Sequence, residues 1–142
     1  MSNDWFQDIV DFHNEVMLDK HLPKFPSIPH PAYQRLRRTL IKEEVKETIH
    51  AITMNDVSAI ADGIADSIVV LLGTAVTYGI DMRPIWDIVH GSNMAKKGGK
   101  LRADGKMLKK EGWQPPDIAG EIRRQQANIN TIISKSDEGG SK

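Results

Sequence analysis

The stretch LRRTLIKEEVKE, residues 36–47, decides the fold, because an apolar stripe and a dense acidic cluster share it. It lies in a longer segment, residues 32–54, in which apolar side chains recur every three or four positions. This spacing predicts one long amphipathic helix with a single apolar face. The apolar positions of the stripe are Leu36, Leu40, Ile41, Val45, Ile49 and Ile52.

Further helices are expected on both sides of this segment. Asp56 is a good N-cap for a strongly apolar helix that reaches Tyr78, with Gly79 at its C-terminal cap. A first helix begins at Asn3 or Asp4 and ends near Lys20, before a connector with four prolines. Two later helices are expected over residues 81–95 and 118–133.

These elements predict an all-α fold, an antiparallel bundle of four to five helices. Residues 3–133 are expected to form a single helical domain, because the chain is too short for two ordinary ones. Residues 134–142 are polar and rich in Gly and Ser, so we expect a flexible tail there.

Composition sets the broad class of the protein. A chain of 142 residues with 39% hydrophobic and 27% charged residues suits a compact soluble domain. Its 19 Lys and Arg balance 19 Asp and Glu, so no global field attracts nucleic acid or an acidic membrane. We expect no export signal, because the first residues lack a basic region and an apolar core. The sequence has no cysteine, and its longest apolar stretch, residues 67–80, is expected to be too short to span a bilayer. We expect a cytoplasmic protein without a membrane partner, and nucleic acid is not favoured.

Two acidic clusters carry the chemistry. Glu43, Glu44 and Glu47 crowd one side of the long helix, and Asp62 and Asp66 lie one turn apart on the next helix. If the two helices pack antiparallel, the clusters face each other, and five carboxylates repel unless a hard divalent cation holds them. Mg²⁺ suits such oxygen ligands, and Mn²⁺ could substitute for it.

The second cluster is the more informative one. Asp66 is surrounded in sequence by apolar residues, so we expect it at the buried edge of its helix, where an unpaired carboxylate is costly. A Glu-Glu-x-x-Glu pattern alone is more often a solvated helix face than a metal site. The acidic pair within an apolar helix shifts the interpretation toward a metal site.

Taken together, these features resemble the all-α nucleoside triphosphate pyrophosphohydrolases, of MazG and phosphoribosyl-ATP pyrophosphohydrolase type. The likeness covers roughly residues 10–118 and rests on the order and spacing of several segments. They are residues 12–13, the proline-rich connector, and residues 36–47, 62–75, 90–96, 105–106 and 112–118. The resemblance implies that a metal-activated water attacks the α-phosphorus of a nucleoside triphosphate and that pyrophosphate leaves.

The family signature is Glu-Glu-x-x-Glu followed by Glu-x-x-Asp on the next helix. The acidic residues that match it, to which the resemblance gives the catalytic role, are Glu43, Glu44, Glu47 and Asp66. Gly63 stands where the second motif has its Glu. Asp62, one residue earlier, is the candidate for the missing carboxylate, so the number of metal ions stays open.

A basic, glycine-containing stretch after the fourth expected helix is a candidate phosphate clamp. Residues 96–110 hold seven basic residues and one acid, and their glycines allow a close backbone approach to a ligand. A solvated, flexible loop is the alternative for any single lysine. By the resemblance, Asn93 and Lys96 match an Asn-x-x-Lys that meets metal-bound phosphate, and Lys97 is placed with them on one helical face.

Other polar residues are weaker substrate-binding candidates. His13 and His90 could donate hydrogen bonds to the substrate, although a lone histidine is more often structural. In the family, the base pocket is lined partly by the first helix and the connector. That makes Phe12, His13 and Asn14 candidates for contact with the base.

Three further residues have structural or solvent-exposed interpretations. Arg37 or Arg38 could reach phosphate from the turns before the acidic cluster, with simple solvation as the other interpretation. Trp113 is expected to anchor the C-terminal segment by packing.

The sequence thus predicts a metal-dependent nucleoside triphosphate diphosphohydrolase in nucleotide-pool control, with dGTP, dUTP, dCTP and dATP all open as substrates. One alternative is a phosphoribosyl-ATP pyrophosphohydrolase. Another is a non-catalytic helical module that binds nucleic acid through the basic stretch. Relatives assemble as dimers or tetramers and a small bundle has a narrow core, so we expect a homodimer or homotetramer.

Overall fold

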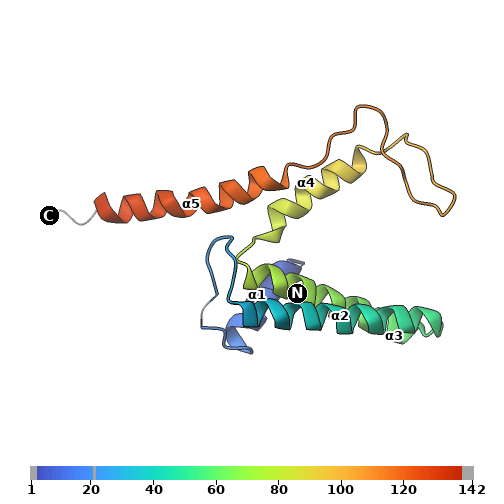
Figure 1. Cartoon of the computed structure of the whole chain (residues 1–142), viewed down its shortest axis with the longest axis horizontal. Coiled ribbons are helices and arrows are strands. Elements are labelled where there is room, and N and C mark those ends of the chain that lie inside the picture. Colours follow the sequence, from blue (N-terminus) through green and yellow to red (C-terminus); the bar gives the residue numbers. More distant parts are fainter. Residues whose placement is uncertain (1–2, 21, 139–142) are drawn as a thin grey trace. The chain divides into compact units, whose positions relative to one another are not determined.

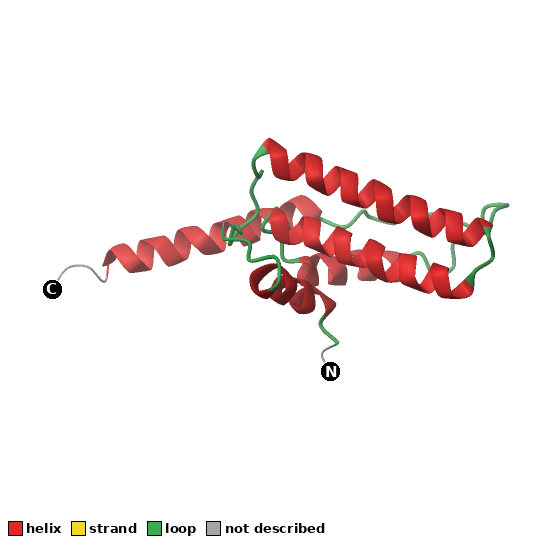
Figure 2. Cartoon of the chain, turned by 90° about the horizontal axis from the view of Figure 1, so that it is seen from below, coloured by secondary structure: helices red, strands yellow, loops and turns green. Residues whose placement is uncertain are grey.

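The fold is all-helical (Figures 1 and 2), as expected from the sequence. The computed structural model describes residues 3–20 and 22–138, with side chains described as far as residue 128. Its helices are α1 (Trp5–Glu15), α2 (Pro31–Thr53), α3 (Val57–Thr77), α4 (Met82–Met94) and α5 (Ile118–Glu138). The described residues form no strand, and an isolated bridge joins Leu101 to Met107.

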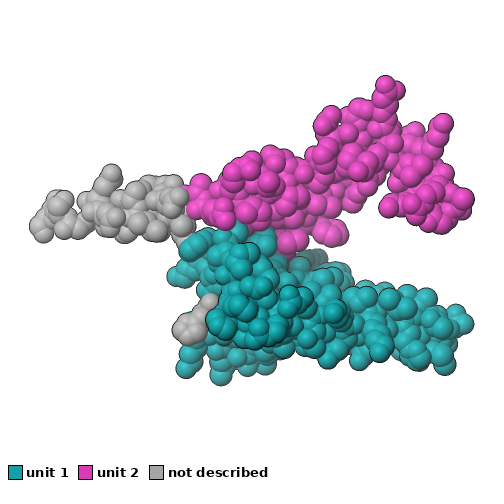
Figure 3. Space-filling view, viewed as in Figure 1, with its two compact units in different colours: residues 1–81 teal, residues 82–142 magenta. Residues whose placement is uncertain are grey.

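The chain divides into two compact units, shown in different colours in Figure 3. Residues 1–81 hold α1, α2 and α3, and residues 82–142 hold α4 and α5. The expected acidic residues all belong to the first unit, whereas the basic stretch after α4 belongs to the second.

The expected caps form at several helix ends. Asp56 caps α3, where its carboxylate accepts a hydrogen bond from the Ala59 N–H at 3.0 Å. Asp117 caps α5 in the same way, accepting from the Gly120 N–H at 2.9 Å. Gly79 follows α3 with a φ of +70°, the left-handed conformation that favours glycine at a helix C-terminus.

The first helix is shorter than expected, because α1 ends at Glu15 and not near Lys20. Leu18 adopts a φ of +53°, which stops the helical path. The chain then turns back, so that the Asp19 carboxylate reaches the His13 ring nitrogen Nδ1 at 2.8 Å. A side-chain contact that sequence periodicity does not reveal thus sets the end of α1.

The last helix is longer than expected. α5 continues to Glu138, whereas the sequence was expected to leave the helix near Ile133. Residues 134–138 contain neither Gly nor Pro, so nothing in their composition stops a helix that has already formed. The remainder of the expected tail, residues 139–142, lies outside the described residues.

α2 and α3 pack antiparallel and form the centre of the first unit. Arg37 near the start of α2 contacts Thr74 near the end of α3, and Thr48 contacts Ser67 further along. This order of contacts defines the antiparallel arrangement. The buried apolar residues of the first unit are few: Phe6, Ile9, Ala51, Val70, Ala75 and Val76.

The apolar stripe predicted on α2 is only partly buried within the chain. Leu40 and Ile41 are half-buried, but Ile49 and Ile52 remain 59% and 55% exposed. On α3, Leu71 is likewise 49% exposed. The pair of helices therefore leaves apolar surface uncovered by the described part of the chain.

Candidate active site

The acidic residues of α2 and α3 border a groove at one end of the helix pair. The groove has a volume of about 630 Å³, within the range of small-molecule sites. Three expected site residues line it, namely Glu43 and Glu47 from α2 and Asp62 from α3. Lys46 and His50 line it as well.

Sequence reasoning did not single out Lys46 and His50. Both follow an expected acidic residue by three positions, Lys46 after Glu43 and His50 after Glu47. Since residues three apart share a helix face, this spacing could have placed them beside the carboxylates.

Glu44 shows that the two acidic clusters are close in space. It is half-buried, and its pKa is raised above the ordinary value for a glutamate. Burial is the largest cause, followed by the negative charges of the other four expected acidic residues, Glu47, Asp66, Glu43 and Asp62. The antiparallel packing therefore brings all five carboxylates into one electrostatic neighbourhood.

No cation among the described residues pairs directly with this group. None of the five carboxylates forms an ion pair or accepts a side-chain hydrogen bond from a described residue. Within the described ranges, no three acidic or histidine side chains converge closely enough to hold a metal ion as they stand. The cluster has the oxygen donors and the excess of negative charge that a hard divalent cation requires, but not a preformed cage.

Asp66 differs from the expectation of a buried edge, because it is exposed. Its neighbours Ile64 and Ala65 are exposed too, since α3 has apolar residues on a face that the described chain does not cover. The apolar residues around Asp66 in sequence therefore do not bury it in the single chain.

Gly63 explains the departure from the family's second motif. It is buried against α2, where an added Cβ would lie 2.6 Å from the Thr48 hydroxyl and 3.0 Å from the Thr48 Cα. The contact with backbone leaves no room for a glutamate without moving the helices apart. Asp62 lies one position earlier and lines the groove, so it supplies a carboxylate next to a position that cannot hold one.

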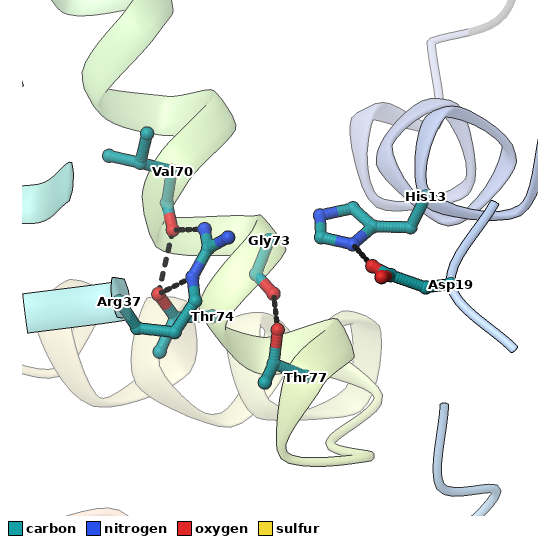
Figure 4. A network of polar contacts seen from close by, with 7 residues as sticks. All are labelled: His13, Asp19, Arg37, Val70, Gly73, Thr74 and Thr77. Atoms are coloured by element: carbon teal, nitrogen blue, oxygen red, sulfur yellow. Dashed lines mark hydrogen bonds and ion pairs between the residues drawn. The ribbon is translucent and has the colours of Figure 1, made fainter. Parts of the chain in front are cut away.

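The other end of the same helix pair is a polar network in which the groups satisfy one another (Figure 4). The buried Arg37 donates to the Thr74 hydroxyl at 3.1 Å and to the Val70 carbonyl at 2.6 Å. Burial lowers the pKa of Arg37, and the negative charge of Asp19 partly offsets this effect. Arg37 thus joins α2 to α3 inside the fold. The sequence interpretations, contact with phosphate or simple solvation, did not predict this role.

Gly73 lets α1 approach α3 within this network. A Cβ added there would lie 2.6 Å from an Arg37 guanidinium nitrogen and 2.8 Å from the His13 Nε2. His13 is only 3% exposed and holds Asp19 through its other ring nitrogen. Arg37 shares its helix face with Ile41 and Glu44 by the three-to-four spacing, which is the signal that could have placed it at the helix interface.

A smaller pocket of about 250 Å³ lies beside this network. The connector and the ends of α2 and α3 contribute its lining: Asp19, Leu22, Pro23, Ser27, Pro29, His30, Tyr33 and Thr77. None of the base-side candidates Phe12, His13 and Asn14 is among them; Phe12 and Asn14 are exposed on α1. Their role in substrate binding stays a prediction.

The phosphate-side candidates lie in the second unit. Asn93 accepts a hydrogen bond from the Lys96 ammonium at 3.0 Å, so these two side chains are in contact. Lys97 and His90 are exposed. Trp113 is half-buried and donates from its indole nitrogen to the Ser92 carbonyl at 2.8 Å, a bond that ties it to α4; its expected role as a packing anchor of the C-terminal segment stays a prediction.

A family comparison covers most of this arrangement. The model for phosphoribosyl-ATP pyrophosphohydrolase matches residues 11–93, more than half of the chain and all five acidic residues. The chain belongs to this family. The family is part of the MazG-like superfamily of all-α nucleoside triphosphate pyrophosphohydrolases, so the resemblance inferred from the sequence is confirmed. The protein is accordingly a pyrophosphohydrolase, a hydrolase that acts on phosphorus-containing anhydrides. A search of curated proteins finds no match to the chain.

Membership of this family also bears on α3. Among the described residues, α3 is the one helix long and apolar enough to cross a membrane by length and composition. It exceeds the apolar stretch of residues 67–80, because its N-terminal half extends it to 21 residues. That half carries Asp62 and Asp66, and the family is typically soluble, so α3 is a weak candidate for a membrane span.

Proposed function

We propose that the protein hydrolyses a nucleoside or deoxynucleoside triphosphate to the monophosphate and pyrophosphate, in control of the nucleotide pool. Water adds to the α-phosphorus, the bond to the bridging oxygen breaks, and that oxygen leaves with pyrophosphate. The observation that carries the proposal is the set of five unpaired carboxylates around Glu44, beside a groove of about 630 Å³.

The proposed cofactor is Mg²⁺, with Mn²⁺ able to replace it. Glu43, Glu44, Glu47, Asp62 and Asp66 would hold it, because they are oxygen ligands of one charge that form no ion pair with a described cation. A bound divalent ion lowers the pKa of water and stabilises negative charge on phosphate oxygens. In the proposed reaction, one glutamate of α2 orients the attacking water and accepts its proton.

The second unit supplies the proposed phosphate contacts. Asn93, Lys96 and Lys97 lie at the end of α4 or directly after it, and His90 lies one turn earlier. For the base, we propose the connector side of the first unit, where the 250 Å³ pocket offers apolar walls and polar groups such as Asp19 and Tyr33. No base or sugar is assigned, because base recognition depends on a few hydrogen bonds.

Phosphoribosyl-ATP is a second candidate substrate. The family model that matches the chain carries the name of that enzyme, which favours this substrate at least as strongly. The same bond is broken in both candidate substrates, since each carries a 5′-triphosphate. The match ends at residue 93, so the basic stretch after α4, over residues 96–110, is not accounted for by the family model.

We also propose that the protein is a homodimer or homotetramer in the cytoplasm. Leu36, Ile49 and Ile52 on α2 and Ile64 and Leu71 on α3 are 45–59% exposed, a large apolar content for a helix pair facing water. A second copy packed on this surface would remove it from solvent.

The test is a turnover panel over the common ribo- and deoxynucleoside triphosphates and phosphoribosyl-ATP, with Mg²⁺ present and products separated by HPLC. Monophosphate plus pyrophosphate from any of these substrates supports the reaction, and the preferred substrate decides between the two candidates. Orthophosphate in place of pyrophosphate would reject the mechanism. Absence of turnover, together with steeply salt-dependent DNA binding, would favour a nucleic-acid-binding module instead.

A further inference from the structure

The basic stretch after α4 folds into an ordered loop over residues 96–110. The Arg102 N–H donates to the Lys106 carbonyl at 2.7 Å, and the Leu108 N–H donates to the Lys100 carbonyl at 2.8 Å. Gly98 and Gly105 allow the turns, with φ of +86° and +88°. The segment, for which a solvated, flexible loop was the alternative to a phosphate clamp, has hairpin-like hydrogen bonds.

The loop's acidic residue is already neutralised. Asp104 receives two hydrogen bonds from the Arg102 side chain, at 2.9 and 2.6 Å, and its pKa is lowered mainly by that contact. The lysines of the loop therefore have no carboxylate partner within it. Their charges are available to an anion from outside the loop.

Trp113 gathers two of these lysines at one place. Its ring is fixed by the hydrogen bond from its indole nitrogen to the Ser92 carbonyl. The Lys109 ammonium lies 4.5 Å from the ring centroid and the Lys96 ammonium lies 5.4 Å from it. The negative face of an indole attracts an ammonium group, so the ring holds both lysines beside it although their like charges repel.

Both ammonium groups keep donors for a ligand. Lys96 uses one N–H on the Asn93 side chain. Lys109 has no hydrogen-bond acceptor among the described residues. An ammonium group carries three donors, so each lysine can still donate to a phosphoryl oxygen while it remains over the ring.

We propose that Lys109 and Lys96, positioned by Trp113, form a two-lysine clamp for the oligophosphate part of the substrate. Two ammonium groups held at one ring can each donate to a different phosphoryl group, so pyrophosphate or a triphosphate tail is bound better than a single phosphate. Lys109 and Trp113 lie outside residues 11–93, the span that the family model matches. The inference rests on the proposed function for the identity of the ligand, but binding can be measured without turnover.

The test uses the fluorescence of Trp113 in the full-length chain carrying Trp5→Phe and Trp86→Phe. These are the other two tryptophans, and both are largely exposed, so their replacement disturbs little packing. Inorganic pyrophosphate is titrated without metal. A saturable change is expected, with orthophosphate binding about five- to tenfold more weakly.

Lys109→Gln in this background is expected to weaken pyrophosphate binding about five- to tenfold. The matched control is Lys110→Gln, because Lys110 has the same charge and exposure but no contact with the Trp113 ring. It should change binding less than about twofold. Equal effects of the two substitutions would show a diffuse charge effect and overturn the clamp.

The remaining outcomes separate this inference from the proposed function. Turnover of nucleoside triphosphates without any saturable Trp113 response would overturn the clamp and leave the enzyme reaction in place. Pyrophosphate binding that depends on Lys109, in a protein that cleaves no triphosphate, would support the clamp and reject the reaction. A single-stranded oligonucleotide that binds through Lys109 and is not displaced by pyrophosphate would also overturn it.

Discussion

The two ends of the α2–α3 pair use polar residues in opposite ways. Around Arg37, buried side chains satisfy one another: the guanidinium reaches Thr74 and Val70, and Asp19 is held by His13. Around Glu44, five carboxylates come together and none has a partner among the described residues. The first end is complete within the chain.

This difference separates a structural polar network from the proposed metal-binding site. Buried polar groups that are fully hydrogen-bonded rigidify a fold and leave nothing for a ligand. Gathered like charges raise the free energy of the folded protein, so they persist at a site where an external cation relieves the repulsion. Substitutions at the two ends should therefore change different measurements.

The largest effect is expected from Glu47→Gln. It keeps the shape of the side chain but removes one charge from the groove, and pyrophosphohydrolase activity should fall by at least about a hundredfold. The melting temperature should not fall. Glu15→Gln, at an exposed glutamate of α1, is the matched control and should retain activity. Full activity in Glu47→Gln would show that catalysis does not need the acidic cluster.

Gly63→Glu restores the family's motif in the sequence, but the packing of α2 against α3 leaves no space for the new side chain. The new Cβ would meet the hydroxyl and the backbone of Thr48, so we expect a loss of about 2–3 kcal/mol in the free energy of unfolding. Activity should fall with it. Asp62→Asn, in contrast, should weaken Mg²⁺ binding, so that half-maximal activity needs a higher Mg²⁺ concentration. The free energy of unfolding should stay nearly unchanged. A Gly63→Glu protein that is stable and more active would show that Asp62 is not the substitute ligand.

Gly73→Ala tests the polar network around Arg37, at the end of the helix pair whose groups satisfy one another. The added methyl group would crowd Arg37 and His13, and chemical denaturation should show a loss of about 1–3 kcal/mol. Gly91 in α4 provides a control of opposite sign, since nothing lies within 4 Å of a Cβ added there. Gly91→Ala should stabilise the protein by up to about 1 kcal/mol through helix propensity. Equal responses at the two glycines would argue against a tightly packed network.

The smallest effect concerns pH and Glu44. Its raised pKa means that the folded protein holds this proton more tightly than the unfolded chain. The associated stabilisation is present below the unfolded pKa and is lost as the pH rises through the folded pKa. In EDTA, Glu44→Gln should therefore melt slightly higher than the unsubstituted protein at pH 7, on the order of 1–3 °C, and the gap should close toward pH 4. A gap of the opposite sign would mean that Glu44 has a favourable partner.

Much of the fold followed from the sequence, because its signals are local. The Asp56 and Asp117 caps and the periodicity of α2 and α3 predicted helix positions to within a few residues. The ends of α1 and α5 were wrong. The first is set by the contact between Asp19 and His13, and the second lacks any stop signal before residue 139.

The grouping of the acidic residues was also predictable, since one turn separates the members of each cluster. The exposure of Asp66 was not, because it depends on which faces of α3 are covered. The burial of Arg37 was equally hidden, since a charged residue in an amphipathic helix is usually solvated. The space that Gly63 and Gly73 leave for neighbouring helices likewise depends on tertiary packing.

The central claim is that the acidic end binds a divalent cation, and Mn²⁺ binding followed by electron paramagnetic resonance tests it most directly. Free Mn²⁺ gives a strong signal that decreases on binding, so the unsubstituted protein should reduce it saturably. Glu47→Gln should lose most of this binding, whereas Glu15→Gln should keep it. Equal Mn²⁺ binding by all three proteins, or none by the unsubstituted one, would contradict the claim.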